Sequence, residues 1–160
     1  MSDEIGDLFR SWCKLDPFPF TKIEWQQVQD SALALLNATF ADDKVLRASL
    51  FEDLSAVLDE LRMRYGDHPI LRETEGDFTD DPLQRVSAYK SAVRAAQPDG
   101  LPTLSTRISL ARVLLEDFDN PDQAASELSA CRSELSAGAD ESETREWFEL
   151  MDRCKQRRNV

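Results

Sequence analysis

The sequence predicts an all-α protein whose antiparallel helical hairpins stack as a short solenoid. Its 160 residues are 41% apolar and 31% charged, as is typical of a globular chain, and 5 glycines and 7 prolines are too few for a turn-rich β fold. Helix-capping signals recur along the chain, and one stretch of sequence is repeated. An irregular helical bundle is the alternative architecture.

The repeat pairs residues 40–51, FADDKVLRASLF, with residues 78–89, FTDDPLQRVSAY. A third copy, one residue shorter, lies at 118–128, FDNPDQAASEL. Similarity at a spacing of 38 to 40 residues indicates helical pairs that bury their faces by stacking on one another. The repeated positions are Phe40, Phe78 and Phe118; Arg47, Arg85 and Ala124; and Phe51, Tyr89 and Leu128. We expect the last three to be mostly buried.

The first 20 residues are predicted to precede a single helical-repeat domain at 21–160. Residues 3–13, DEIGDLFRSWC, favour a short helix, and the DPFPF linker at 16–20 is stiffened by its prolines. Phe18 and Phe20 are expected to fold this helix back on the first hairpin.

The first helix of the repeat domain begins in FTKIEW. Thr21 and Glu24 have the spacing of a capping box, and Phe20 and Trp25 flank it as a hydrophobic staple. These residues predict a helix start at about residue 21.

Capping residues also predict the later helices. The DD pair at 42–43 caps a helix over about 44–65, which Gly66 ends. DPLQ at 81–84 and NPDQ at 120–123 each combine a capping residue with proline at the first helical position. QPDGLP, at 97–102, predicts a loop, and Asp140 and Glu143 cap a last helix. We expect helices of about 12 to 20 residues.

In these repeated segments the chain resembles the tetratricopeptide repeat family over about residues 24–136. EGDF at 75–78 is similar to the family's turn between two helices, and AASELSAC, from Ala124, is similar to its second helix. The family repeats at about 34 residues, so the extra residues here fall in the turns. The resemblance implies a solenoid in which Ala124, Leu128, Cys131, Tyr89 and Ala92 are packing positions.

The sequence predicts no catalytic residue, no cofactor and no metal site. His68 is the only histidine, and its place in GDHPIL indicates a surface residue at a helix start. The five glycines stand apart, so they form no phosphate-binding loop. Asp117, Asp119 and Asp122 lack the glycine and glutamate of a calcium-binding loop and are interpreted as capping acids. We therefore expect a protein that is not an enzyme.

The cysteines and the N-terminal sequence indicate a cytoplasmic protein. Cys13, Cys131 and Cys154 are odd in number and form no CxxC pair, which is typical of reduced thiols. The first residues resemble no signal peptide, and no apolar stretch is long enough to cross a membrane.

Charge narrows the class of partner. The net charge of −12 argues against nonspecific nucleic-acid binding, and residues 116–152 hold twelve acids against two bases. The basic end, RCKQRRNV, suits a helix C-terminus.

The remaining function is protein binding. Stacked helical pairs make a concave face that would hold a peptide or helix of a partner, with Arg47 and Arg85 as candidate contacts to carboxylates. The two arginines could instead be exposed side chains paired with Asp43 and Asp81. The alternative function is an acidic chaperone-like or inhibitory, immunity-type protein, whose 116–152 face masks a basic surface of its client. The oligomeric state and the partner's identity are left open by the sequence.

Overall fold

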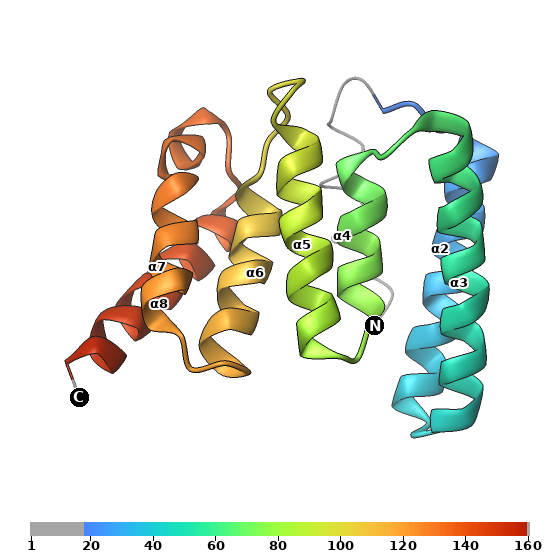
Figure 1. Ribbon diagram of the computed structural model, residues 1–160, viewed down its shortest axis with the longest axis horizontal. Helices are drawn as coiled ribbons and strands as arrows, with labels where there is room; N and C mark the ends of the chain where they lie inside the picture. Colours follow the sequence, from blue (N-terminus) through green and yellow to red (C-terminus); the bar gives the residue numbers. More distant parts are fainter. Residues whose placement is uncertain (1–17, 160) are drawn as a thin grey trace. The chain divides into compact units, whose positions relative to one another are not determined.

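The computed structural model describes residues 18–159, and every regular element in that range is a helix (Figure 1). No β-strand occurs between residues 18 and 159, so the all-α class is confirmed for this range. The helix expected within residues 3–13 lies outside the described residues.

The chain separates into two compact units at the Phe78–Thr79 bond. The first unit contains α2 (Lys22–Phe40), α3 (Lys44–Tyr65) and α4 (Pro69–Phe78). The second contains α5 (Pro82–Ala96), α6 (Leu104–Glu116), α7 (Pro121–Ala130), the 3-10 helix η2 (Arg132–Ala137) and α8 (Glu141–Arg158). The boundary falls inside the segment predicted as the middle repeat, so its two helices belong to different units.

In the first unit, α2 and α3 form the predicted antiparallel hairpin, and α4 packs against α3 (Figure 1). The capping box of Thr21 and Glu24 is present, which confirms the predicted start of α2. The rings of Phe20 and Trp25 stack with centroids 5.7 Å apart, as a staple requires. The core is aliphatic along the hairpin and aromatic at the N-terminal end of α2. Its fully buried large side chains are Val28, Leu35, Leu54, Leu58, Ile70 and Leu71.

The second unit is arranged around α6, which contacts α5, α7 and α8. Because neighbours cover it on several sides, eight of its 13 residues are buried. The core of this unit is mostly aliphatic and also contains the aromatic rings of Tyr89 and Trp147 and two thiols. Its fully buried large side chains are Leu110, Leu115, Leu128, Cys131 and Cys154.

The turns before α3 and α7 share one geometry. Asp42 and Asp119 have positive φ, 53° and 46°, and each directly precedes the residue that caps the next helix. The side chains of Asp43 and Asn120 then accept from the backbone N–H three residues on. The sequence similarity between these two copies is therefore a similarity of turn structure.

The repeated positions differ in burial. Tyr89, Ala124 and Leu128 are buried, whereas Phe51 is only half-buried, which corrects the expectation for Phe51. Phe40 and Phe118 are exposed, because Phe40 is the last residue of α2 and Phe118 follows the end of α6. Phe78 is half-buried at the end of α4.

Helix length also departs from expectation. α4 and α7 have 10 residues each and α3 has 22, outside the expected range of about 12 to 20.

Candidate functional site

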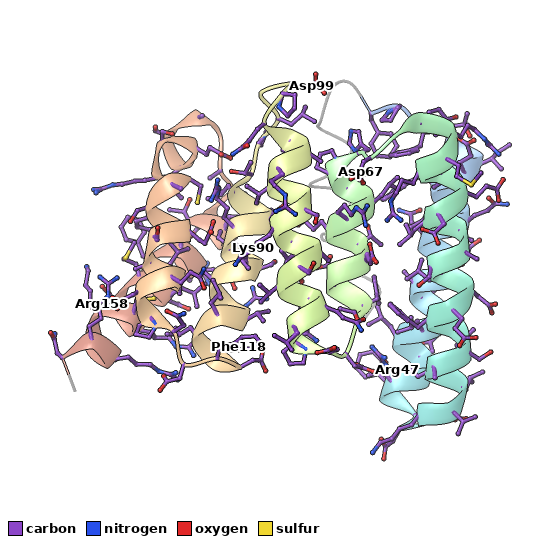
Figure 2. The ribbon with its side chains drawn as sticks, in the orientation of Figure 1. Arg47, Asp67, Lys90, Asp99, Phe118 and Arg158 are labelled. Atoms are coloured by element: carbon purple, nitrogen blue, oxygen red, sulfur yellow. The ribbon has the colours of Figure 1, made fainter. Side chains whose placement is uncertain are left out.

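The repeated arginines donate to main-chain carbonyls within their own units. Arg47, near the α2–α3 turn (Figure 2), donates to the carbonyl of Phe78 at 3.0 Å and to the hydroxyl of Thr39 at 2.9 Å. Arg85 donates to the carbonyl of Thr79 at 2.9 and 3.3 Å. Phe78 is the last residue of α4, where a cation compensates the unsatisfied carbonyls of a helix end.

The two aspartates considered as partners of these arginines cap helices instead. Asp43 accepts from the backbone N–H of Leu46 at 2.9 Å, and Asp81 accepts from that of Leu83 at 3.0 Å. A sequence argument finds the repeated arginine but not its acceptor, because a main-chain carbonyl leaves no mark in the sequence.

Arginines of α6 and α8 pair with five of the twelve acids in the 116–152 window. The guanidinium groups of α8 pair with acids at the end of α6 and the start of α7: Arg153 with Glu116 at 3.0 Å, Arg157 with Asp119 at 2.7 Å and Arg158 with Asp122 at 2.7 Å. Arg107 and Arg112 of α6 bind Glu127 and Glu146. The basic end of the chain therefore serves as the internal counter-charge of this window.

Glu134 has a structural role that local sequence does not indicate. Its carboxylate accepts from the backbone N–H groups of Thr103 and Leu104 and from the Thr103 hydroxyl, each at 2.8 Å. A residue of η2 thus caps the N-terminus of α6, whose own N-cap side chain makes no capping bond.

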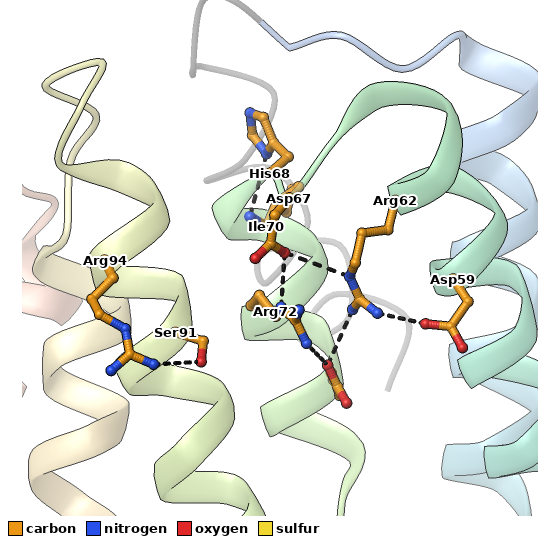
Figure 3. Close-up of polar contacts among 9 residues, drawn as sticks. Asp59, Arg62, Asp67, His68, Ile70, Arg72, Ser91 and Arg94 are labelled. Atoms are coloured by element: carbon orange, nitrogen blue, oxygen red, sulfur yellow. Dashed lines mark hydrogen bonds and ion pairs between the residues drawn. The ribbon is translucent and has the colours of Figure 1, made fainter.

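His68 is half-buried at the start of α4, so the prediction of a surface histidine is wrong. Its Nδ1 accepts from the backbone N–H of Ile70 at 3.3 Å, and its ring meets the edge of Phe20 with centroids 5.5 Å apart. Beside it, Asp67 lies between the guanidinium groups of Arg62 and Arg72, at 3.5 and 2.7 Å (Figure 3). This ionic network connects the end of α3 to α4.

Exposed large apolar side chains are concentrated on the α2–α3 hairpin. Six are exposed there: Ile23 (76%), Phe40 (73%), Val45 (84%), Met63 (90%), Leu33 and Leu46. In the described part of the second unit only Leu83, Phe118 and Phe148 belong to this class. Helical spacing places these six side chains on more than one face of the hairpin, so they do not form a single stripe.

A groove runs between α2 and α3 and is hereafter called the hairpin groove. Its volume is about 250 Å³, and it is lined by Ile23, Glu24, Gln27, Val57, Glu60, Leu61 and Arg64. Val57 and Leu61 belong to an apolar line on α3 that continues toward the α2–α3 turn. Leu50 precedes Val57 by seven residues and Leu46 precedes it by eleven, and residues at these spacings share a helix face. No residue of α3 before Leu54 is buried, so this line becomes more exposed toward the turn.

Arg64 and Tyr65 bind the acidic side chains at one end of the hairpin groove. Arg64 binds Glu24 and lies 2.8 Å from Glu60, and the hydroxyl of Tyr65 donates to Glu24 at 2.8 Å. The backbone N–H of Thr21 and the Tyr65 hydroxyl lower the pKa of Glu24 to about 2. Glu24 is therefore a permanent negative charge at neutral pH.

The described residues show no arrangement suited to metal binding or thiol chemistry. Between residues 18 and 159, no group of three His, Cys, Asp or Glu side chains could hold a metal ion. Cys131 and Cys154 are buried, and burial raises the pKa of the Cys131 thiol to about 11. None of the helices α2 to α8 has the length and apolar composition needed to cross a bilayer.

Sequence reasoning named the arginines and the acidic window but missed the hairpin groove. A usable signal was present, because Leu46, Leu50 and Val57 follow helical spacing along the edge of the buried stripe that contains Leu54, Leu58 and Leu61. No family model, curated protein or solved structure matches this chain.

Proposed function

We propose that this chain is a non-enzymatic protein–protein interaction module that binds a peptide or helix of a partner through the α2–α3 hairpin. The observation that carries the proposal is the hairpin groove with the exposed Ile23 in its lining; five more large apolar side chains are exposed elsewhere on the same hairpin. In interfaces, a few well-packed side chains near the centre contribute most of the binding energy, and aromatic residues and methionine are enriched there.

The proposal retains the tetratricopeptide-like interpretation for the hairpins. The shared turn of Asp42 and Asp119, followed by a capping residue, supports α2–α3 and α6–α7 as copies of one unit. Helical repeats present extended surfaces for peptides and helices.

Photo-crosslinking from defined positions tests the proposal. A benzophenone amino acid replaces Ile23 in the hairpin groove or, as a matched exposed position, Glu149 of α8. Capture of a partner from Ile23 and not from Glu149 supports the hairpin. Capture from Glu149 alone would favour the acidic masking protein instead.

Arg47 and Arg85 are the second candidate contact. Their guanidinium groups already donate to carbonyls, so a partner's carboxylate would have to replace or share those bonds. Converting both to glutamate separates the two roles. A lowered melting temperature with crosslinking at Ile23 retained indicates structural arginines, whereas an unchanged melting temperature with lost capture indicates partner contacts.

A further inference from the structure

The hairpin groove is lined by residues 23–27 of α2 and 57–64 of α3, so it occupies the end of the hairpin away from the α2–α3 turn. An apolar line on α3 extends past the groove, from its lining residues Leu61 and Val57 to Leu50 and Leu46, roughly 22 Å at 1.5 Å per residue. From α2, Ile23 stands at one end of the groove and Ala34, eleven residues on, lies on the same helix face. A helix of about 15 residues with one apolar stripe would cover this length.

Acidic side chains flank that line on both helices. Glu24 and Glu60 line the groove. Asp30 and Asp53 lie next to it on the helix surface, because they are three residues from Gln27 and four residues from Val57. Arg64 is the one base among the residues that line the groove, and its guanidinium already binds Glu24 and Glu60. The polar border of the groove is therefore negative.

We infer that the hairpin groove binds a basic amphipathic helix of a partner protein, an inference that rests on the proposed function. The partner's apolar stripe packs on Leu46, Leu50 and Val57, and its lysines and arginines face the acidic border. A second copy of this chain fits less well. Residues 22–65 carry a net charge of −3 and the whole chain −12, so two identical hairpins would bring like charges together.

Two synthetic peptides test the inference against the full chain. Both are amphipathic helices of about 15 residues with the same leucine stripe. One has lysine at every flanking position and the other glutamate, and each carries a fluorophore for anisotropy titration. The lysine peptide should bind roughly tenfold tighter than the glutamate peptide, and its affinity should fall severalfold as salt screens the border charges.

Variants of the chain locate the binding site. Ile23→Lys and Leu46→Lys should each weaken binding of the lysine peptide, because the first places a cation in the groove and the second places one on the apolar line. Met63→Lys is the matched control, since Met63 is exposed on α3 but does not line the groove. Asp53→Asn should weaken binding, whereas Glu52→Gln, its exposed neighbour, should not. Circular dichroism and melting curves verify that each variant folds.

The outcomes separate this inference from the proposed function. Equal binding of both peptides overturns the basic partner while leaving the hairpin as an interaction surface. Failure of both peptides to bind also overturns it, and crosslinking from Ile23 still reports on the proposed function independently. Sedimentation completes the test: a dimer that Ile23→Lys dissociates would make a second copy the occupant, which contradicts the inference.

Discussion

Helices α3 and α6 show how differently the two units use apolar side chains. α3 has 22 residues and buries three, whereas α6 has 13 residues and buries eight. The difference follows from their neighbours. α6 contacts α5, α7, α8 and the 3-10 helix η2, while α3 contacts α2 and α4 and becomes more exposed toward the α2–α3 turn. An apolar residue at helical spacing therefore indicates a face, and only the packing decides whether that face is core or surface.

The two units also differ in how their acidic side chains are paired. The acids of residues 116–152 are the densest in the sequence, yet guanidinium groups of α6 and α8 bind many of them. The α2–α3 hairpin has fewer acids, and Asp42, Glu52 and Asp53 are exposed there, as Asp117, Asp140 and Glu149 are in the 116–152 window. The number of acids in a segment thus does not indicate which segment remains able to attract a partner.

The largest expected effect lies in the core of the second unit. Trp147→Ala should lower the free energy of unfolding by about 3–5 kcal/mol, because the indole is buried and its Nε1–H donates to the Leu128 carbonyl at 2.9 Å. Phe148→Ala, one residue on and exposed, should change it by less than about 0.5 kcal/mol. Chemical denaturation followed by circular dichroism measures both. Equal losses of unfolding free energy in the two variants would contradict the placement of Trp147 in the core of this unit.

Removal of the cap that Glu134 provides for α6 should have the second-largest effect on stability. Glu134→Gln should lower the free energy of unfolding by about 1–3 kcal/mol, because the amide lacks the negative charge of the carboxylate and the second acceptor oxygen that binds the Thr103 hydroxyl. Glu149→Gln, an exposed glutamate of α8, is the control. Hydrogen exchange at the amides of Thr103 and Leu104 should accelerate in the first variant only. Unchanged exchange there would contradict the cap.

The half-burial of Phe51 predicts a smaller effect in the first unit. Phe51→Ala should lower the free energy of unfolding by about 1–2 kcal/mol, below the range for a fully buried phenylalanine. Phe40→Ala removes the same ring from an exposed position and should be nearly neutral. A loss at Phe51 as large as that at Trp147 would mean that the uncovered part of α3 is packed like α6.

These cases show which features a sequence can predict. The caps by Thr21, Asn120 and Asp140 lie within three residues of the groups they bind, so local sequence was sufficient, and each was confirmed. The cap by Glu134 joins residues 31 apart, and only the folded chain brings them together. The same holds for the carbonyl acceptors of Arg47 and Arg85. Helix positions were therefore predictable, whereas the hairpin groove depended on which faces the neighbouring helices leave open.

The network at the N-terminal end of the hairpin predicts a pKa effect. The folded-state pKa of Glu24 is lowered to about 2, so its stabilising contribution is present above the unfolded value of about 4.3 and is lost as pH falls toward 2. Tyr65→Phe removes one donor, and we expect the pKa of Glu24 to rise while the Thr21 backbone donor remains. Carboxyl-detected NMR titration measures the change. An unchanged pKa in this variant would remove Tyr65 from the network.

The smallest expected effect belongs to the ion pairs of α8, although they neutralise the most acidic part of the chain. Arg157 and Asp119 are both more than a third exposed, so solvent and salt screen their attraction. Arg157→Gln should therefore lower the free energy of unfolding by no more than about 1 kcal/mol, and the loss should shrink at high salt. Arg132→Gln, an exposed arginine before this helix, is the control and should be neutral. A loss of stability in Arg157→Gln as large as that in Trp147→Ala, and independent of salt, would mean that these arginines form part of the core. The surface charge of the second unit would then need a different explanation.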